Sequence, residues 1–151
     1  MVGDTFYNYD NEAIACIAIN GLLKQLNKIS MAKALLILPI FLHDPIIQRL
    51  KSNARYRSID EFVIKERMTI GDLNLRVENF LPITLNSISM LADMGFLALK
   101  GTDLVALKSE DIFDSKEAGK RAEAMKKAIL KAVFLFQEDD ESTFLKFNIL
   151  L

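Results

Sequence analysis

The sequence predicts a mainly α-helical protein with one short β-hairpin, and three observations support this prediction. Apolar residues recur at the helical period in most segments of the chain. Ser30 and Ser58 each stand directly before such a segment, as helix N-caps do. Two short apolar runs, FLALK and LVALK, flank Gly101-Thr102-Asp103, which is the pattern of a tight hairpin turn.

The first predicted helix covers Glu12 to Leu26, with Asp10 or Asn11 as its N-cap. Gly21 lowers the helix propensity of this segment, so we expect another element to pack closely against it. The helical period is set by Ile14, Ile17, Ala18, Leu22 and Leu26.

The second predicted helix covers Met31 to His43 and is capped by Ser30. Its central part, Ala34 to Leu42, reads ALLILPIFL and is apolar on every helical face. This stretch is much shorter than the roughly 20 apolar residues that cross a bilayer. Either the rest of the chain or a partner must therefore cover it, and the sequence leaves both alternatives open.

Helix-start signals also divide the middle of the chain. Asp44, as a cap before Pro45, predicts a short helix from Ile46 to Asn53. Ser58-Ile59-Asp60-Glu61 matches a capping box and predicts a helix from Ile59 to about Arg67. Gly71-Asp72 ends that region, after which we expect a helix from Leu73 to Asn79 and a bend from Asn79 to Pro82.

A helix from Ile83 to Met94 is predicted to end at Gly95, directly before the hairpin. A helix, a glycine stop and a hairpin in this order are typical of a winged helix-turn-helix domain, so we predict a winged helix-turn-helix-like core. The predicted buried face contains Leu85, Ile88, Leu91 and Ala92. The predicted outward positions are Thr84, Asn86, Ser87, Ser89, Met90 and Asp93.

A last long helix is predicted over Ser115 to Gln137, basic in its first half and apolar in its second. The closing segment FLKFNILL is too apolar for a free tail, so we expect it to pack on the domain or on a partner. With 151 residues, 51% of them hydrophobic, the chain is predicted to form a single domain over residues 1–151.

The net charge of −1 predicts no bulk attraction to nucleic acid or to an anionic membrane. A local basic cluster, together with Tyr56, is a candidate for nucleic-acid contact, although charge runs on small domains are usually only solvated. The outward positions of the Ile83–Met94 helix include no arginine or lysine, which argues against sequence-specific reading of DNA. The candidate nucleic-acid contacts are Arg49, Lys51, Arg55, Arg57 and, on the hairpin, Lys100.

The chain contains one histidine and one cysteine, which leaves few options for catalysis. His43 is the one candidate general base, but the favoured interpretation is that its ring satisfies backbone carbonyls at a helix end. Cys16 lies in the apolar context AIACIAI and is interpreted as a core residue. We therefore expect a non-enzymatic protein without cofactor or metal, in the reducing cytoplasm and not in a membrane.

Three blocks of the sequence resemble the middle component of prokaryotic three-component ABC-ATPase systems, including the accessory subunit of Lamassu-type antiphage defence. The similarity spans roughly residues 6 to 108, and its most specific part is Leu38-Pro39-Ile40-Phe41-Leu42-His43-Asp44-Pro45. The resemblance implies an accessory subunit that binds an SMC-like ABC ATPase and a separate effector, often a nuclease. The three blocks are YDNEAIACIAI, ALLILPIFLHDP and FLPITLNSISMLADMGFLAL.

The leading hypothesis is a non-enzymatic bridging subunit of a defence complex, with DNA contact only inside that complex. It rests on the apolar helix, the apolar C-terminal segment and the lack of a catalytic set. The alternative is a DNA-binding winged-helix transcriptional regulator. An enzyme that uses His43 is the third hypothesis.

Overall fold

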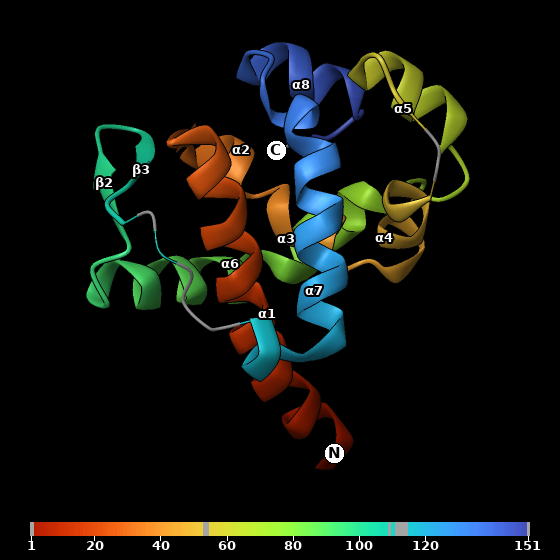
Figure 1. Cartoon of the computed structure of the whole chain (residues 1–151). Coiled ribbons are helices and arrows are strands. Elements are labelled where there is room, and N and C mark those ends of the chain that lie inside the picture. Colours follow the sequence, from red (N-terminus) through yellow and green to blue (C-terminus); the bar gives the residue numbers. More distant parts are fainter. Residues whose placement is uncertain (1, 53–54, 109, 111–114, 151) are drawn as a thin grey trace.

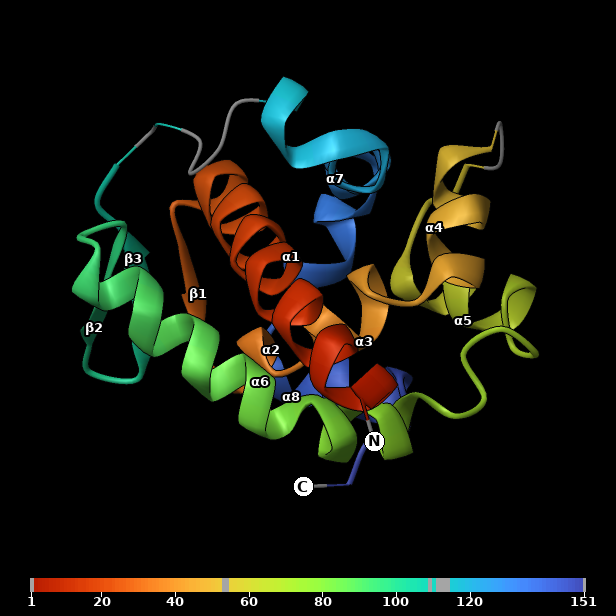
Figure 2. The ribbon, with the colours of Figure 1, turned by 90° about the horizontal axis from the view of Figure 1, so that it is seen from below.

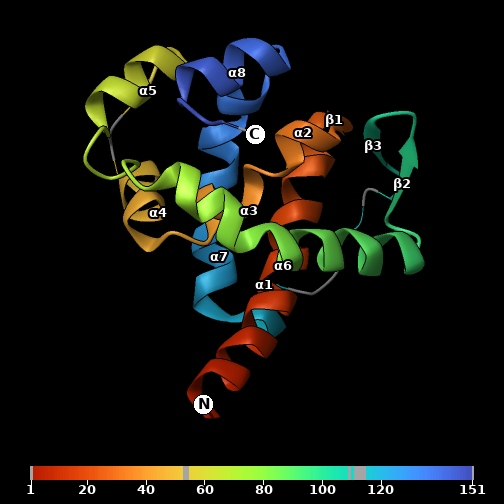
Figure 3. The same cartoon turned by 180° about the vertical axis from the view of Figure 1, so that it is seen from behind.

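The computed structural model describes the backbone of residues 2–52, 55–108, 110 and 115–150, and their side chains except at 2–11 and 115–118. The protein is mainly helical with a small antiparallel sheet, which confirms the predicted fold class. Helix α1 (Val2–Leu26) runs through the middle of the molecule, beside α7 (Ser115–Ala132) (Figure 1). Helix α6 (Leu73–Asp93) crosses α1 on the outside, as Figure 2 and Figure 3 show.

Helix α1 begins earlier than predicted, since the backbone of Asp10 and Asn11 lies inside it and neither residue is its N-cap. No proline or glycine interrupts residues 4–20, and extending a formed helix costs less than starting one. The close packing predicted at Gly21 is confirmed. A Cβ atom built there would lie 3.1 Å from the Cδ1 atom of Ile129 on α7.

The predicted hairpin is confirmed as strands β2 (Leu97–Lys100) and β3 (Asp103–Ala106). A third strand that the sequence analysis missed, β1 (Lys28–Ser30), pairs antiparallel with β3 and gives the order β1-β3-β2. Ile29 faces Leu104 in this pairing, and both side chains are buried. The sheet thus ties the segment after α1 to the hairpin after α6. The winged helix-turn-helix assignment stays a prediction.

The single helix predicted over Met31–His43 is wrong, because the structure contains α2 (Met31–Ala34) and α3 (Ile37–Phe41), separated by a turn. Pro39 explains the break, since its ring clashes with the carbonyl four residues earlier, at Leu35. The Ser30 cap is confirmed, with its hydroxyl accepting from the Lys33 amide at 3.1 Å. All five residues of α3 are buried, so the chain itself covers this apolar segment.

Helix α4 (Asp44–Lys51) is N-capped by the backbone of His43, so Asp44 is its first helical residue and not the predicted cap. The predicted helix end, Asn53, lies outside the described residues. Helix α5 (Ile59–Lys65) starts at Ser58, whose hydroxyl accepts from the Glu61 amide at 3.2 Å. This half of the capping box is confirmed. In the other half, the Glu61 carboxylate would accept from the Ser58 amide, but it accepts from the amide of the preceding residue, Arg57, at 3.1 Å.

Helix α6 is continuous, so the bend predicted from Asn79 to Pro82 is wrong. Pro82 and Glu78 are both exposed, so water can satisfy the Glu78 carbonyl that the missing amide of Pro82 leaves unpaired. The predicted stop at Gly95 is confirmed, with a φ of 80° at that glycine. Phe96 donates to the Leu91 carbonyl and Gly95 to the Ala92 carbonyl, which together form a Schellman motif.

The predicted last helix Ser115–Gln137 is wrong in two places. Gly119, with a φ of 83°, kinks α7, and the helix ends at Ala132 before a 3-10 turn, η1 (Val133–Phe136). Helix α8 (Asp140–Lys146) follows, and the buried Phe147 and Ile149 pack on the domain as expected. Leu151 of this segment lies outside the described residues.

In the described part of the chain, no single helix has both the length and the apolar character needed to cross a membrane. One pair, Met31–Phe41 with Asp44–Lys51, passes on length and composition, although it bends by 86°.

Candidate functional site

The basic cluster predicted around α4 and α5 contains a buried carboxylate that the sequence analysis did not identify. The Glu66 side chain is 2% exposed and accepts from the Arg49 Nε atom at 2.9 Å with both oxygens. The Tyr56 hydroxyl donates to the same carboxylate at 2.9 Å. Tyr56 is therefore engaged through its hydroxyl, and Arg49 through its Nε atom, while the Arg49 side chain is still 55% exposed.

Burial and the Glu66 carboxylate raise the pKa of Tyr56 to about 12. Its ring packs edge-on against Phe62, with centroids 5.0 Å apart, and stacks on Phe134 at 6.2 Å. Two effects of Glu66 raise the pKa of Arg49: the hydrogen bond to its carboxylate is the larger, and the negative charge of that carboxylate is the smaller. Tyr56 is thus partly buried against the core, with a satisfied hydroxyl and with its ring packed on Phe62 and Phe134.

The remaining members of the predicted basic set do not form a single surface. Lys51, Arg55 and Arg57 are exposed on α4 and the loop that follows it. Lys100 is exposed at the end of β2, and Figure 1 and Figure 3 both place the hairpin and α4 at opposite sides of the molecule. The structure therefore does not unite Lys100 with the others in one surface.

His43 contacts the backbone and not a catalytic group. Its Nε2 atom lies 3.2 Å from the Thr69 carbonyl, in the segment between α5 and α6, so the ring satisfies a different carbonyl from the predicted helix end. Burial, and then the charge of Arg76, lower the pKa of His43. Among the described residues, no group of three or more His, Cys, Asp or Glu is placed to hold a metal ion.

Cys16 is a core residue, as the sequence predicts, with 3% of its surface exposed. Its thiol lies 3.9 Å from the Ser87 carbonyl on α6, to which it donates. Burial raises the pKa of the Cys16 thiol, which disfavours the reactive thiolate. This geometry is that of a buried helix contact and not of an activated nucleophile.

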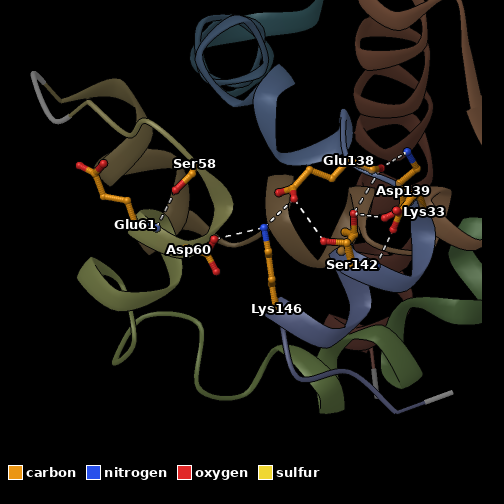
Figure 4. Close-up of polar contacts among 9 residues, drawn as sticks. Lys33, Ser58, Asp60, Glu61, Glu138, Asp139, Ser142 and Lys146 are labelled. Carbon is orange, nitrogen blue, oxygen red and sulfur yellow. Dashed lines mark hydrogen bonds and ion pairs between the residues drawn. The ribbon is translucent and has the colours of Figure 1, made fainter.

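A polar network holds the C-terminal segment on the domain (Figure 4). The Lys33 ammonium on α2 donates to the carbonyl of Phe136 at 3.0 Å and to that of Glu138 at 2.7 Å. On the other side, the Lys146 ammonium lies 2.6 Å from the Glu138 carboxylate and 3.1 Å from that of Asp60 on α5. Lys33 thereby links α2 to the segment before α8, and its ammonium lies 3.9 Å from the Asp140 carboxylate at the start of α8. Lys146 links α8 to α5.

The exposed face of α6 differs from the predicted one. Thr84 and Ser87, predicted to point outward, are buried against the domain, whereas Leu85 and Ala92, predicted to be buried, are exposed. The prediction considered only the segment after Pro82, while the buried face continues from Leu73 through the whole helix. As a result, several large apolar side chains lie on the outside of α6, among exposed polar residues.

Two hollows lie beside α7, one of about 320 Å³ between α4 and α7, the other of about 200 Å³ above Gly21. Phe41, Ile47 and Met125 form apolar parts of the first, with Lys120 and Arg121 also lining it. Neither hollow contains a histidine or cysteine that could serve in catalysis.

A model of the ABC-three component (ABC-3C) system Middle Component 3 family matches residues 8–144. The chain belongs to the Middle Component 3 family. The matched region includes α7 and most of α8, whereas the resemblance found in the sequence ended at about residue 108. No curated protein and no solved structure matched the chain in these comparisons.

Membership of the Middle Component 3 family makes this chain one component of a three-component system that also contains an ABC ATPase. This family membership is consistent with a role as an accessory subunit in a multi-component assembly. The apolar α3 segment and the C-terminal Phe147 and Ile149 are covered by the chain itself. Large apolar side chains that are exposed lie on the outside of α6 and, around α5 and α8, at Ile64, Met68 and Leu145.

Proposed function

We propose that this chain is a non-enzymatic bridging subunit of a prokaryotic antiphage defence complex in the cytoplasm. It links an SMC-like ABC ATPase to an effector subunit, of which a nuclease is the favoured type. Membership of the Middle Component 3 family carries the proposal, because a middle component functions within an assembly. DNA contact through Arg49, Lys51, Arg55 or Arg57 is proposed only inside that assembly, where other subunits add contacts.

The state of the chemically reactive side chains supports a non-enzymatic role. His43 bonds to a backbone carbonyl, and Cys16 is buried with a raised thiol pKa. Neither side chain has the partner network that a general base or nucleophile requires. A His43→Gln variant that forms the complex and retains defence would agree with this proposal. A folded His43→Gln variant that has lost an enzymatic activity of the wild type would instead support the enzyme hypothesis.

Co-purification tests the bridging role. The chain is expressed with the two other components encoded beside it, captured through a tag on the ABC ATPase, and analysed by size-exclusion chromatography. We expect this chain to elute with the ATPase and to be required for the effector to elute with it. An effector that binds the ATPase equally well without this chain would contradict the bridging role.

The second candidate is a DNA-binding winged-helix transcriptional regulator, favoured by the helix α6 that runs directly into a hairpin. Its weakness is the outer surface of α6, where Glu78 and Asp93 are exposed and would repel phosphate. A regulator would bind duplex DNA by itself, with an affinity that falls steeply as salt rises and that reversal of Arg55 and Arg57 abolishes. We expect no such binding by the isolated chain.

A further inference from the structure

Large apolar side chains gather on the outside of α6. Five of them are between 39% and 58% exposed, and two more, Leu99 and Leu107, are exposed on or beside the hairpin that follows. Figure 2 and Figure 3 show α6 along the outside of the molecule, with no other element over it. We call this surface the α6 face, and its apolar members on the helix are Leu75, Leu81, Leu85, Met90 and Met94.

The exposed charged side chains on helix α6 itself are both acidic. Glu78 and Asp93 are exposed on α6, and Arg76 is the only basic residue between Leu73 and Asp93. The Arg76 side chain turns inward, with Nε donating to the Pro39 carbonyl at 3.3 Å and the guanidinium 5.3 Å from the centre of the Phe80 ring. The α6 face therefore offers apolar contacts, three exposed polar side chains (Asn79, Asn86 and Ser89) and two carboxylates. At its hairpin end, the Lys108 ammonium donates to the Met94 carbonyl at 3.3 Å.

The C-terminal segment extends this surface at the start of α6. The amide of Leu150 donates to the Asn74 side chain at 3.2 Å, and the Leu150 side chain is 78% exposed. Exposed apolar side chains thus recur over about 30 Å of helix, at 1.5 Å per residue, from the C-terminal segment to the hairpin. Exposed Asn79, Asn86 and Ser89 lie among them. A mixed surface of this length suits an amphipathic partner helix better than a small ligand.

We propose that the α6 face binds a helix of another component of the three-component system, and that this helix has an apolar stripe flanked by lysine or arginine. The proposal rests on the proposed function and names its contact surface. Charge selects the occupant. A second copy of the chain would bring the same two carboxylates to the interface, with a Lys108 ammonium that already contacts the Met94 carbonyl and the Phe96 ring of its own copy. Duplex DNA would meet those carboxylates with its phosphates.

Two matched pairs of variants of the full chain test the proposal. Leu85→Ser on the α6 face is compared with Leu130→Ser, another exposed leucine on α7. Glu78→Lys is compared with Glu123→Lys, an exposed glutamate on α7. Each chain is mixed separately with the purified ATPase and with the purified effector, and each Kd is measured at low and at moderate salt. Circular dichroism and thermal unfolding verify that each variant is folded.

We expect Leu85→Ser and Glu78→Lys each to raise the Kd by about tenfold, while the Kd values of the α7 controls stay near that of the wild type. The Kd of Glu78→Lys should also depend less on salt, because a pair across the interface has been removed. If the wild type binds its partners and the α6 variants bind equally well, the inference is wrong and the bridging role stands. If the wild type binds neither component, the proposed function fails and the inference fails with it. A wild-type dimer that Leu85→Ser dissociates would also overturn the inference, since the occupant would be a second copy.

Discussion

The Tyr56 hydroxyl lies 2.9 Å from the carboxylate of Glu66, a side chain that is almost completely buried. Arg49 contacts the same carboxylate from the solvent side. Tyr56 and Glu66 thus join the loop after α4 to the end of α5, and the tyrosine that first indicated a nucleic-acid surface packs against the core.

Replacing Tyr56 by phenylalanine removes one hydrogen bond from Glu66 while leaving the ring contacts in place. We expect Tyr56→Phe to lower the free energy of unfolding by about 1.5 kcal/mol, because a buried carboxylate loses a donor. Denaturant titration measures the change. Arg55→Ala, at an exposed neighbouring position, should change stability by about 0.5 kcal/mol or less. Equal stabilities of Tyr56→Phe and the wild type would show that the hydroxyl bond contributes nothing.

The raised pKa of Tyr56 predicts a loss of stability in alkali. The unfolded chain releases the phenol proton near pH 10, whereas the folded protein retains it up to about pH 12. The stabilising contribution is therefore complete below pH 10 and is lost as pH rises through about 12. The measurement is the difference in unfolding free energy between the wild type and Tyr56→Phe across this range. A difference that stays constant from pH 9 to about 12 would contradict the raised pKa.

Gly21 and Ile129 should show energetic coupling, since a Cβ atom at Gly21 would lie 3.1 Å from the Ile129 Cδ1 atom. Gly21→Ala gains about 1 kcal/mol of helix propensity but loses part of it to this contact. Ile129→Val removes the Cδ1 atom, so the double variant should be more stable than additivity predicts, by about 0.5 kcal/mol or more. A double-mutant cycle by chemical denaturation measures the coupling. Simple additivity would show that α1 and α7 move apart to admit the methyl group.

Gly95→Ala should destabilise the protein by about 1 kcal/mol, because Gly95 has a φ of 80° in the Schellman motif that ends α6. Gly71→Ala is the matched control, since its nearest neighbour would be the Arg67 carbonyl at 3.5 Å, an ordinary contact. Thermal unfolding compares the two. If Gly71→Ala costs as much as Gly95→Ala, the backbone conformation at Gly95 is not the cause.

Local signals in the sequence predicted local structure well. The caps at Ser30 and Ser58 and the stop at Gly95 were predicted correctly because each depends on hydrogen bonds within a few residues. Strand β1 was missed because three residues carry little pattern, and their partner β3 lies about 75 positions further along. The continuous α6 was missed because proline usually breaks a helix, and only the exposed position of Pro82 makes it tolerable.

The candidate site was predicted less well than the fold. Composition and spacing identified Arg49 and Tyr56 as a basic and aromatic surface, yet nothing local shows that Glu66 is buried between them. The outer face of α6 was predicted from a segment that began after Pro82, so Leu85 was assigned to the core and Thr84 to solvent. In both cases the outcome depends on long-range packing, which periodicity in one segment does not contain.

The pairing of Ile29 with Leu104 and the bond from Lys33 to Glu138 span most of the polypeptide. During synthesis, α1 and α3 therefore leave the ribosome long before the segments that cover them. The apolar ILPIF segment remains uncovered until α6 and α7 have emerged, which makes the nascent chain a client for chaperones that bind hydrophobic sequences.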